Sequence, residues 1–245
     1  MDKVRRIDRV IALTKMLADK PGHLFPLGHF AEIFGAAKST LSEDIVTIKQ
    51  VFDQFGLGKL ETVAGAAGGV RFQPVCPPDY VRQVLTELAK KLATPDRLIP
   101  GGFLYMSDVL FNPAWMAKVG EIFYSQFAHL EPNYIMTVET KGIPLALMTA
   151  RAFNLPLVMV RSSGKVTEGP SVSINYVTGS SKRIQTMSVP RRAIPSGAKV
   201  LVIDDFMKAG GTARGMHDLA AEVGAQVVGT GVLVATAVPE QKLVE

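Results

Sequence analysis

The chain has 245 residues, 47% of them hydrophobic and 20% charged, with a formal net charge of +5 at neutral pH. A chain of this length and apolar content folds into one or two well-packed domains, which excludes an intrinsically disordered protein. It has one cysteine, no apolar run as long as a membrane span and no signal peptide before its first charged helix, so we expect a cytoplasmic protein without a membrane partner.

The first 74 residues predict three helices followed by two strands. Pro26 and Gly35 mark the start and end of the second helix, because proline suits the first turn and glycine the position after the last. Thr40-Leu41-Ser42-Glu43 fits a capping box at the start of the third. The expected elements are helices over 4–18, over 26–35 and from 38 onward, then strands over 59–63 and 70–74. This order is that of a winged-helix domain, a relative of the helix-turn-helix.

Hydrophobic spacing predicts which faces of these helices are buried. In the first helix the expected core face carries Ile7, Val10, Ile11 and Leu17, and the arginines mostly outside it are Arg5, Arg6 and Arg9. In the third helix the expected core residues are Leu41, Ile45, Ile48, Phe52 and Phe55. The polar residues left available on its outer face are Lys38, Ser39, Ser42 and Lys49.

A linker is expected at residues 74–78, because prolines there interrupt both helix and strand patterns. Beyond it the expected elements alternate: helix 79–93, strand 103–109, helix 112–128, strand 134–138, helix 143–153 and strand 157–161. This alternation argues for an α/β domain with a mostly parallel sheet. Residues 162–185 have weak periodicity and predict a long loop, which in a compact domain is usually functional.

Residues 200–212 (VLVIDDFMKAGGT) combine a buried strand, two adjacent carboxylates and a loop of small residues. Ligands of open α/β sheets bind outside the carboxyl ends of the strands, where this loop is expected. The loop and the helix after it offer free backbone N–H groups, which attract a phosphate. Because Asp204 and Asp205 would repel a phosphate, they suit sugar hydroxyls or a metal ion. Together these residues predict a site for a ribose 5-phosphate.

The same segment resembles the phosphoribosyl pyrophosphate (PRPP) motif of type I phosphoribosyltransferases, in which a hydrophobic strand, an acid pair and a Gly-Gly-Thr loop follow one another. Thr140-Lys141-Gly142, after the strand over 134–138, resembles the turn that holds the pyrophosphate in that family. The resemblance also implies that the basic excursion around Arg161, Lys165, Lys182 and Arg183 closes over PRPP. The alternative for this excursion is a surface hairpin with solvated charges. It implies that Mg²⁺ arrives with PRPP, and we expect no cofactor and no all-protein metal site.

The effector-binding residues expected on this basis are Asp204, Asp205, Phe206, Met207, Lys208, Ala209, Gly210, Gly211, Thr212, Thr140, Lys141, Gly142, Arg161, Lys165 and Phe103. Phe103 either stacks on a base or fills the core, and core is the commoner place for a phenylalanine. Lys208 departs from the family pattern, which has a small or hydroxylated residue in this part of the loop. That departure weakens the expectation of turnover, and no catalytic residue is assigned.

A winged helix followed by such a domain resembles the purine operon repressors of Gram-positive bacteria, most strongly at residues 37–39, 66–70, 140–144 and 204–212. The resemblance implies an N-terminal winged-helix domain over 1–74 and a type I phosphoribosyltransferase-like domain over 75–245. It implies a homodimeric regulator of purine biosynthesis genes, expected to be a repressor, that senses PRPP without catalysis. The residues expected on double-stranded operator DNA are Lys38, Ser39, Thr40, Ser42 and Lys49, with Arg5, Arg6 and Arg71 on phosphates.

Two other functions stay open: a working purine phosphoribosyltransferase with an appended domain, and a protein-binding scaffold. Charge does not decide between them, because residues 1–75 hold ten Lys and Arg against eight Asp and Glu. The densest basic stretch, Arg161–Lys199, suits an anionic small ligand or nucleic acid equally well. The sequence also leaves open the sign of regulation, and whether guanosine tetraphosphate or other purine nucleotides compete with PRPP.

Overall fold

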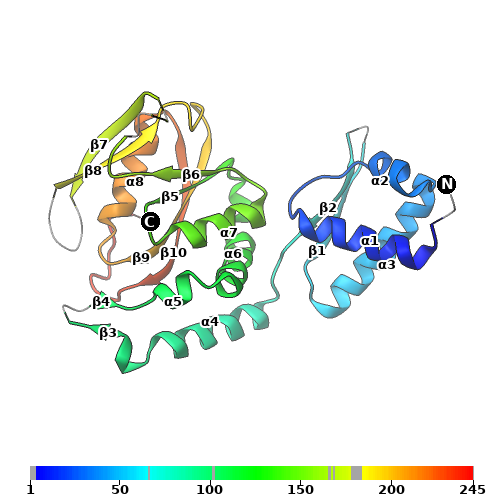
Figure 1. The fold of residues 1–245 in the computed structure, drawn as a ribbon, viewed down its shortest axis with the longest axis horizontal. Helices are drawn as coiled ribbons and strands as arrows, with labels where there is room; N and C mark the ends of the chain where they lie inside the picture. The colour runs from blue at the N-terminus through cyan, green and yellow to red at the C-terminus, as the bar shows by residue number, and fades with distance from the viewer. Residues whose placement is uncertain are drawn as a thin grey trace. The chain divides into compact units, whose positions relative to one another are not determined.

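The computed structural model describes residues 4–65, 67–100, 103–164, 167, 169–177 and 184–244 of the chain (Figure 1). The chain forms two compact units, one of residues 1–85 with 151–154, the other of residues 86–150 with 155–245. Within the described part, every helix is either too short or too polar to cross a bilayer.

The first unit has the winged-helix order of elements. Its helices are α1 (Arg6–Asp19), α2 (Leu27–Phe34) and α3 (Lys38–Phe55), and its hairpin pairs β1 (Lys59–Val63) with β2 (Gly69–Gln73). Pro26 and Gly35 flank α2 as predicted, and Gly35 has a left-handed φ of 58° that ends the helix. Phe25, just before α2, forms a β-bridge with Val70 of β2, in which the two residues exchange two backbone hydrogen bonds of 2.9 Å.

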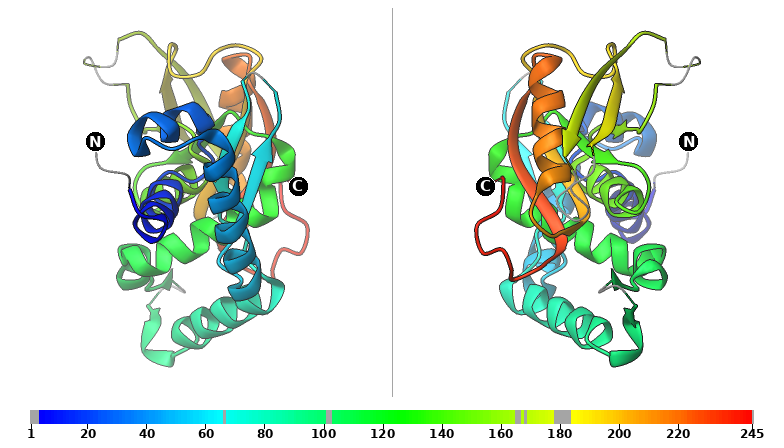
Figure 2. Two further views of the ribbon diagram at one scale, coloured as in Figure 1. Left: turned by 90° about the vertical axis from the view of Figure 1, so that its right-hand side faces the viewer. Right: turned by 90° about the vertical axis from the view of Figure 1, so that its left-hand side faces the viewer.

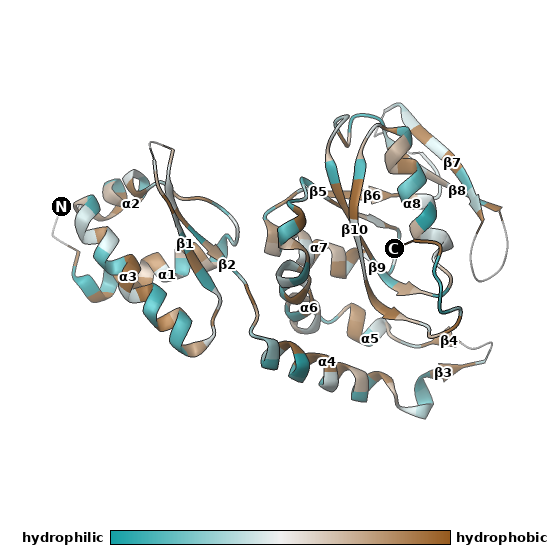
Figure 3. Cartoon of the chain, turned by 180° about the vertical axis from the view of Figure 1, so that it is seen from behind, coloured by the Kyte–Doolittle hydropathy of each residue, from teal (hydrophilic) through white to brown (hydrophobic). Residues whose placement is uncertain are grey.

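All three helices and both strands contribute to the core of this unit. Of the residues predicted on the inner face of α3, Leu41, Ile45, Ile48 and Phe52 are buried. Figure 3 shows hydrophobic and hydrophilic colours alternating around α3, as expected for a helix with one buried face. The exposed side of α3 carries its polar residues together with the exposed Val46 and Val51.

The structure corrects four predictions for this unit. Ile7 and Ile11 are exposed, because α1 instead buries the face that carries its two leucines. Phe55, the last residue of α3, is exposed as well. Arg9 is buried rather than outside, since it forms an ion pair with the buried carboxylate of Asp44. The capping box is absent: α3 begins two residues before Thr40 and its N-cap, Ala37, has no side-chain hydrogen bond.

The second unit alternates helices and strands. After α4 (Pro78–Leu92) come η1 (Pro95–Arg97), β3 (Leu98–Ile99), β4 (Phe103–Leu104), α5 (Ser107–Leu110), α6 (Pro113–Phe127), η2 (Ala128–Leu130), β5 (Tyr134–Val138), α7 (Ile143–Phe153), β6 (Leu157–Val160), β7 (Ser171–Val177), β8 (Ile184–Pro190), β9 (Lys199–Met207), α8 (Gly211–Glu222) and β10 (Gln226–Ala235).

A parallel four-stranded sheet in the order β10-β9-β5-β6 forms the centre of this unit. From β5 the chain moves outward to β6, and later returns to place β9 on the other side of β5, with Val202 opposite Met136. The direction of strand addition therefore reverses between β5 and β9. Open α/β sheets bind ligands at such a switch point.

Both faces of the sheet are covered, which explains the continuous hydrophobic run of β9. Val200 and Val202 belong to the buried cluster that includes Leu219 of α8, the orange helix along one face of the sheet in Figure 2. On β10, a side chain at Gly231 would meet Phe127 of α6 and Ile203 at about 3 Å, so glycine lets α6 approach closely. Figure 3 accordingly shows β9 and β10 mostly in hydrophobic colours.

Three predictions for this unit are wrong. The predicted strand over 103–109 is only a two-residue strand, β4, followed by helix α5, which the Arg97–Asp108 ion pair (2.7 Å) holds. The expectation of a long loop over 162–185 gives way to the alternative, a hairpin, because this stretch contains β7 and the first residues of β8, which pair antiparallel. The strand was expected to end in the acid pair, but β9 runs on to Met207, so Asp204 and Asp205 lie inside it.

Candidate functional site

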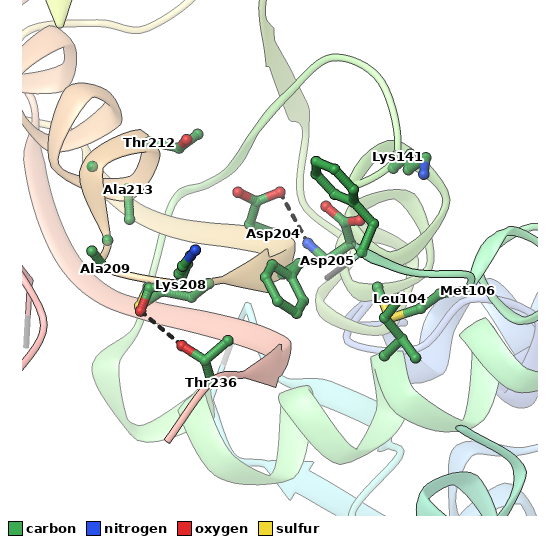
Figure 4. A pocket seen from close by; sticks show the side chains of 15 residues that line it. Leu104, Met106, Lys141, Asp204, Asp205, Lys208, Ala209, Thr212, Ala213 and Thr236 are labelled. Carbon is green, nitrogen blue, oxygen red and sulfur yellow. Dashed lines mark hydrogen bonds between the residues drawn. The ribbon is translucent and has the colours of Figure 1, made fainter. Parts of the chain in front are cut away.

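A cavity of about 400 Å³ opens at the carboxyl ends of β9 and β10. Of the predicted effector residues, Phe103, Lys141 and every residue from Asp204 to Thr212 line it. Figure 4 shows the acid pair in the middle, with the start of α8 on one side and Lys141 on the other. The structure therefore brings together residues that lie up to about a hundred positions apart in the chain.

The two carboxylates differ in their surroundings. Asp204 is 6% exposed, and its Oδ1 accepts a hydrogen bond of 2.9 Å from the backbone N–H of Asp205. Burial removes water from the Asp204 carboxylate and Asp205 adds negative charge beside it, so the pKa of Asp204 is raised well above its usual value. Asp205 is only half-buried and is the more accessible acceptor. Donors or a cation supplied by a ligand would relieve this repulsion.

The turn after β5 lies directly against Asp204. A Cβ on Gly142 would stand 2.6 Å from Thr137 Oγ1 and 2.9 Å from Asp204 Oδ1, so only glycine fits here without displacing its neighbours. Thr137 is fully buried, and its hydroxyl has no hydrogen-bond partner among the described residues. Buried hydroxyls in folded proteins are normally paired, so the Thr137 hydroxyl is available to a polar partner that the described residues do not supply.

The start of α8 offers backbone N–H groups to the same cavity. Gly210 is its N-cap, with a left-handed φ of 88° that suits glycine, and the first bond of the helix runs from Arg214 N to Gly210 O at 2.8 Å. The N–H groups of Gly211, Thr212 and Ala213 therefore have no partner within the helix. Such groups, together with the positive end of the helix dipole, form a site for an anion.

Two lysines complete the electrostatics of the cavity. Lys141 and Lys208 are exposed residues that line it, opposite in charge to Asp204 and Asp205. The cavity thus offers acceptors for hydroxyl groups at its centre and positive groups for phosphates at its margins. A sugar that carries phosphates at both ends matches this pattern.

The remaining predicted effector residues do not line the cavity. Thr140 and Gly142 belong to the turn beside it, and Lys165, Lys182 and Arg183 lie outside the described residues. Arg161 is held by Glu139, with 3.6 Å between its Nη1 and Glu139 Oε2. The same Glu139 accepts hydrogen bonds of 2.8 Å from the backbone and the hydroxyl of Ser162, so it ties together the loops after β5 and β6.

Four lining residues were not predicted: Leu104, Met106, Ala213 and Thr236. Thr236 had a signal, because it follows the hydrophobic run that forms β10 and so comes to the same sheet edge. Tyr176 of β7 was also missed. Burial raises its pKa, while a hydrogen bond with Thr212 acts in the opposite direction, which places Tyr176 at the start of α8.

The predicted DNA-binding residues of α3 lie on its outer surface. Lys38, Ser39, Ser42 and Lys49 are exposed, and Thr40 is half-buried. The hydroxyl of Ser42 donates to Lys38 O at 2.9 Å, a bond that an exposed side chain can exchange for a ligand. These residues therefore present hydroxyl and ammonium groups on the exposed side of α3.

The three predicted phosphate-binding arginines all have partners in their own unit. Arg5 Nε donates to Asp8 at 2.8 Å, and Arg71 Nε donates to Glu61 at 2.6 Å. Arg6 donates to Asp44 at 3.3 Å and to the Thr47 hydroxyl at 2.9 Å, which joins α1 to α3. Contact with a phosphate would require each of them to share or leave its carboxylate.

Family models match both parts of the chain. The N-terminal part matches the model of the bacterial purine repressor N-terminal domain over residues 5–74, and the remainder matches the phosphoribosyl transferase domain over residues 106–244. Among solved structures, the adenine phosphoribosyltransferase of Rhodothermus marinus DSM 4252 is similar, with a TM-score of 0.54, 27% identity, and coverage of 64% of this chain and 88% of that one.

Curated relatives align with nearly the whole chain. The purine biosynthesis transcriptional repressor PurR of Bacillus subtilis is 49% identical over 99% of this chain and 85% of its own length. The purine biosynthesis transcriptional activator PurR of Lactococcus lactis subsp. lactis is 36% identical over 99% of this chain and 89% of its own length. The chain therefore belongs to the PurR family of transcriptional regulators of purine biosynthesis, with a DNA-binding N-terminal domain and a phosphoribosyltransferase fold.

Proposed function

We propose that this regulator senses PRPP in the cavity at the end of β9, without catalysing a transfer reaction. The observation that carries the proposal is the meeting, in one cavity, of an acid pair, the N–H groups of a helix start and two lysines. These are the groups that a ribose with a 5-phosphate and a pyrophosphate requires. The sequence predicted this combination of an acid pair, a helix start and lysines at no other place in the described part of the chain.

The expected pose follows from charge. Asp205, with Asp204 beneath it, accepts from the ribose hydroxyls, and the start of α8 binds the 5-phosphate. Lys141 then faces the pyrophosphate. Among the described residues no group of three or more His, Cys, Asp or Glu could hold a metal ion, so Mg²⁺ would be bound mainly by the oxygens of PRPP.

A working phosphoribosyltransferase is the second candidate, because the fold and the family model are shared with such enzymes. Lys208 supports the non-catalytic alternative: a long cation lines the cavity where the resemblance expects a small or hydroxylated residue. Incubation with PRPP and each purine base separates the two, since only an enzyme would produce nucleotide.

On the DNA side, we propose that a homodimer binds operator DNA through the outer face of α3. Lys38, Ser39, Thr40 and Ser42 would face the major groove, with Lys49 at its edge. PRPP carries several negative charges next to the basic stretch 161–199, so its binding would lower the attraction of the protein for DNA phosphates. Other purine nucleotides with a similar charge pattern would compete for the same cavity.

Calorimetry with PRPP and Mg²⁺ tests the site. The double variant Asp204→Ala, Asp205→Ala loses the hydroxyl acceptors, so its PRPP affinity should fall below detection while its operator affinity stays that of the wild type. Thr14→Ala, in α1 of the first unit, is the control for substitution outside the cavity. Unchanged PRPP affinity in the double variant would remove the acid pair from the site.

A further inference from the structure

The loop between β9 and α8 is held from behind by the segment that follows β10. This segment, Thr236–Leu243, is called the tail segment below. The backbone N–H of Thr236 donates to Met207 O at 2.9 Å, and the backbone N–H of Leu243 donates to Ala209 O at 3.0 Å. The hydroxyl of Thr236 lies 3.2 Å from Lys208 O, as the dashed line in Figure 4 shows. Three consecutive carbonyls, that of Met207 at the end of β9 and those of Lys208 and Ala209 in the loop, are thus turned toward the tail segment.

The orientation of these carbonyls fixes that of the N–H groups. In a planar trans peptide the C=O of one residue and the N–H of the next point in opposite directions. The N–H groups of Lys208, Ala209 and Gly210 therefore point away from the tail segment, and none of them has a partner among the described residues. All three residues line the cavity.

The tail segment is itself closed by Lys242. Its ammonium group donates to Thr236 O and to Pro239 O, both at 2.6 Å, and so connects the two ends of the turn. Contact with the loop is close: a Cβ on Gly210 would stand 3.1 Å from Leu243 N. The ammonium of Lys242 is therefore used internally and is not offered to a ligand.

We propose that the tail segment is a positioning element, which holds the N–H groups of residues 208–210 toward the phosphate of the effector, with Lys242 and the N–H of Leu243 as its positioning groups. This inference rests on the proposed function, because it assigns a support to the same site. Hydrogen bonds from N–H groups to a charged phosphate are among the stronger ones in proteins, so loss of their alignment weakens binding even though no ligand contact is removed.

A matched pair of variants at Leu243 isolates the N–H group. Leu243→Pro removes this donor, whereas Leu243→Ala keeps it and removes only an exposed side chain. Lys242→Met, which removes the ammonium that closes the turn, is an independent second variant. PRPP affinity, measured by calorimetry with Mg²⁺, should fall about tenfold or more in Leu243→Pro and Lys242→Met and stay within about twofold in Leu243→Ala. The thermal midpoint and operator affinity without PRPP should be unchanged in all three.

Amide NMR signals of the ligand-free protein give a readout that does not depend on PRPP. The signals of Lys208, Ala209 and Gly210 should shift or broaden in Leu243→Pro and Lys242→Met but match the wild type in Leu243→Ala. The inference is overturned if those signals and the PRPP affinity are unchanged in Leu243→Pro and Lys242→Met, or if Leu243→Ala is as impaired as Leu243→Pro. If the wild type itself does not bind PRPP, the proposed function fails, and the amide signals still decide the role of the tail segment.

Discussion

The ion pair between Arg9 and Asp44 leads to the most quantitative prediction for the DNA-binding unit. The side chain of Asp44 is 1% exposed and that of Arg9 is 6% exposed. Among the described residues, Asp44→Ala would leave the buried Arg9 guanidinium with only Val4 O, 3.2 Å from Nη1, as a hydrogen-bond acceptor. Removing one partner of a buried ion pair typically costs about 3–5 kcal/mol, because the other charge stays buried without compensation. That is a large share of the roughly 5–15 kcal/mol that stabilises a typical domain.

The structure also predicts how the stability costs of three substitutions rank. Arg9→Ala should cost less than Asp44→Ala, because Asp44 keeps Arg6, whose Nε lies 3.3 Å away. Asp19→Ala is the control: it breaks the exposed pair between Lys15 and Asp19, and exposed pairs contribute about 0–1 kcal/mol. The DNA affinity of Asp44→Ala should fall together with its stability, since Asp44 fixes α1 to α3.

Hydrogen exchange followed by mass spectrometry measures these costs in the first unit, through peptides that cover α1 and α3. The single tryptophan, Trp115, lies in α6 of the second unit, so its fluorescence on denaturation provides an internal control that should not change. The reasoning is refuted if Asp44→Ala destabilises α1 and α3 no more than Asp19→Ala does.

Further substitutions test the cavity and the DNA surface separately. Gly142→Ala places a methyl group 2.6 Å from Thr137 Oγ1, so calorimetry should show PRPP affinity reduced at least about tenfold, and unchanged affinity would contradict the crowding. For Asp204, the raised pKa means that the folded state binds its proton more tightly than the unfolded chain. The free energy of unfolding therefore falls as pH rises from the ordinary value of 3.8 through the raised one. Asp204→Asn has no carboxyl group to titrate, so the difference between its free energy of unfolding and that of the wild type should grow across this pH window in denaturant titrations. A difference that stays constant with pH would contradict the raised pKa of Asp204. Lys49→Ala should weaken binding to every duplex and lower the salt slope by about one unit, whereas an unchanged slope would remove Lys49 from the phosphates.

Local patterns predicted the elements that bury one clear face. The buried strand that carries Asp204 and Asp205 and the turn at Lys141 follow from short hydrophobic runs, and the structure has both, although the strand runs two residues further than predicted. The inner face of α3 follows from helical spacing, and four of its five predicted residues are buried. The acid pair and the Gly-Gly-Thr loop could be placed together because the carboxyl ends of parallel strands share one edge.

The errors come from interactions between distant residues, or from a signal that was present but not used. Arg9 could not be predicted as buried from α1 alone, because its partner Asp44 is on α3. The hairpin was held as the alternative to a loop, and a local signal that favours it was not used: in β7, Val172, Ile174 and Tyr176 alternate with polar residues and pack on the core. The contacts of the tail segment with Met207 and Ala209 are backbone hydrogen bonds, which leave no mark in the sequence.

The central claim, that this regulator couples PRPP to DNA, is tested most directly by titrating operator DNA with and without saturating PRPP and Mg²⁺ at fixed ionic strength. The operator is first selected from a genomic library by the protein itself. PRPP should weaken operator binding about 5–150-fold, and operator DNA should weaken PRPP binding by the same factor, because linkage between two sites is reciprocal. The double variant Asp204→Ala, Asp205→Ala should give the same isotherm with and without PRPP. Identical isotherms for the wild type would contradict the account and favour a phosphoribosyltransferase instead.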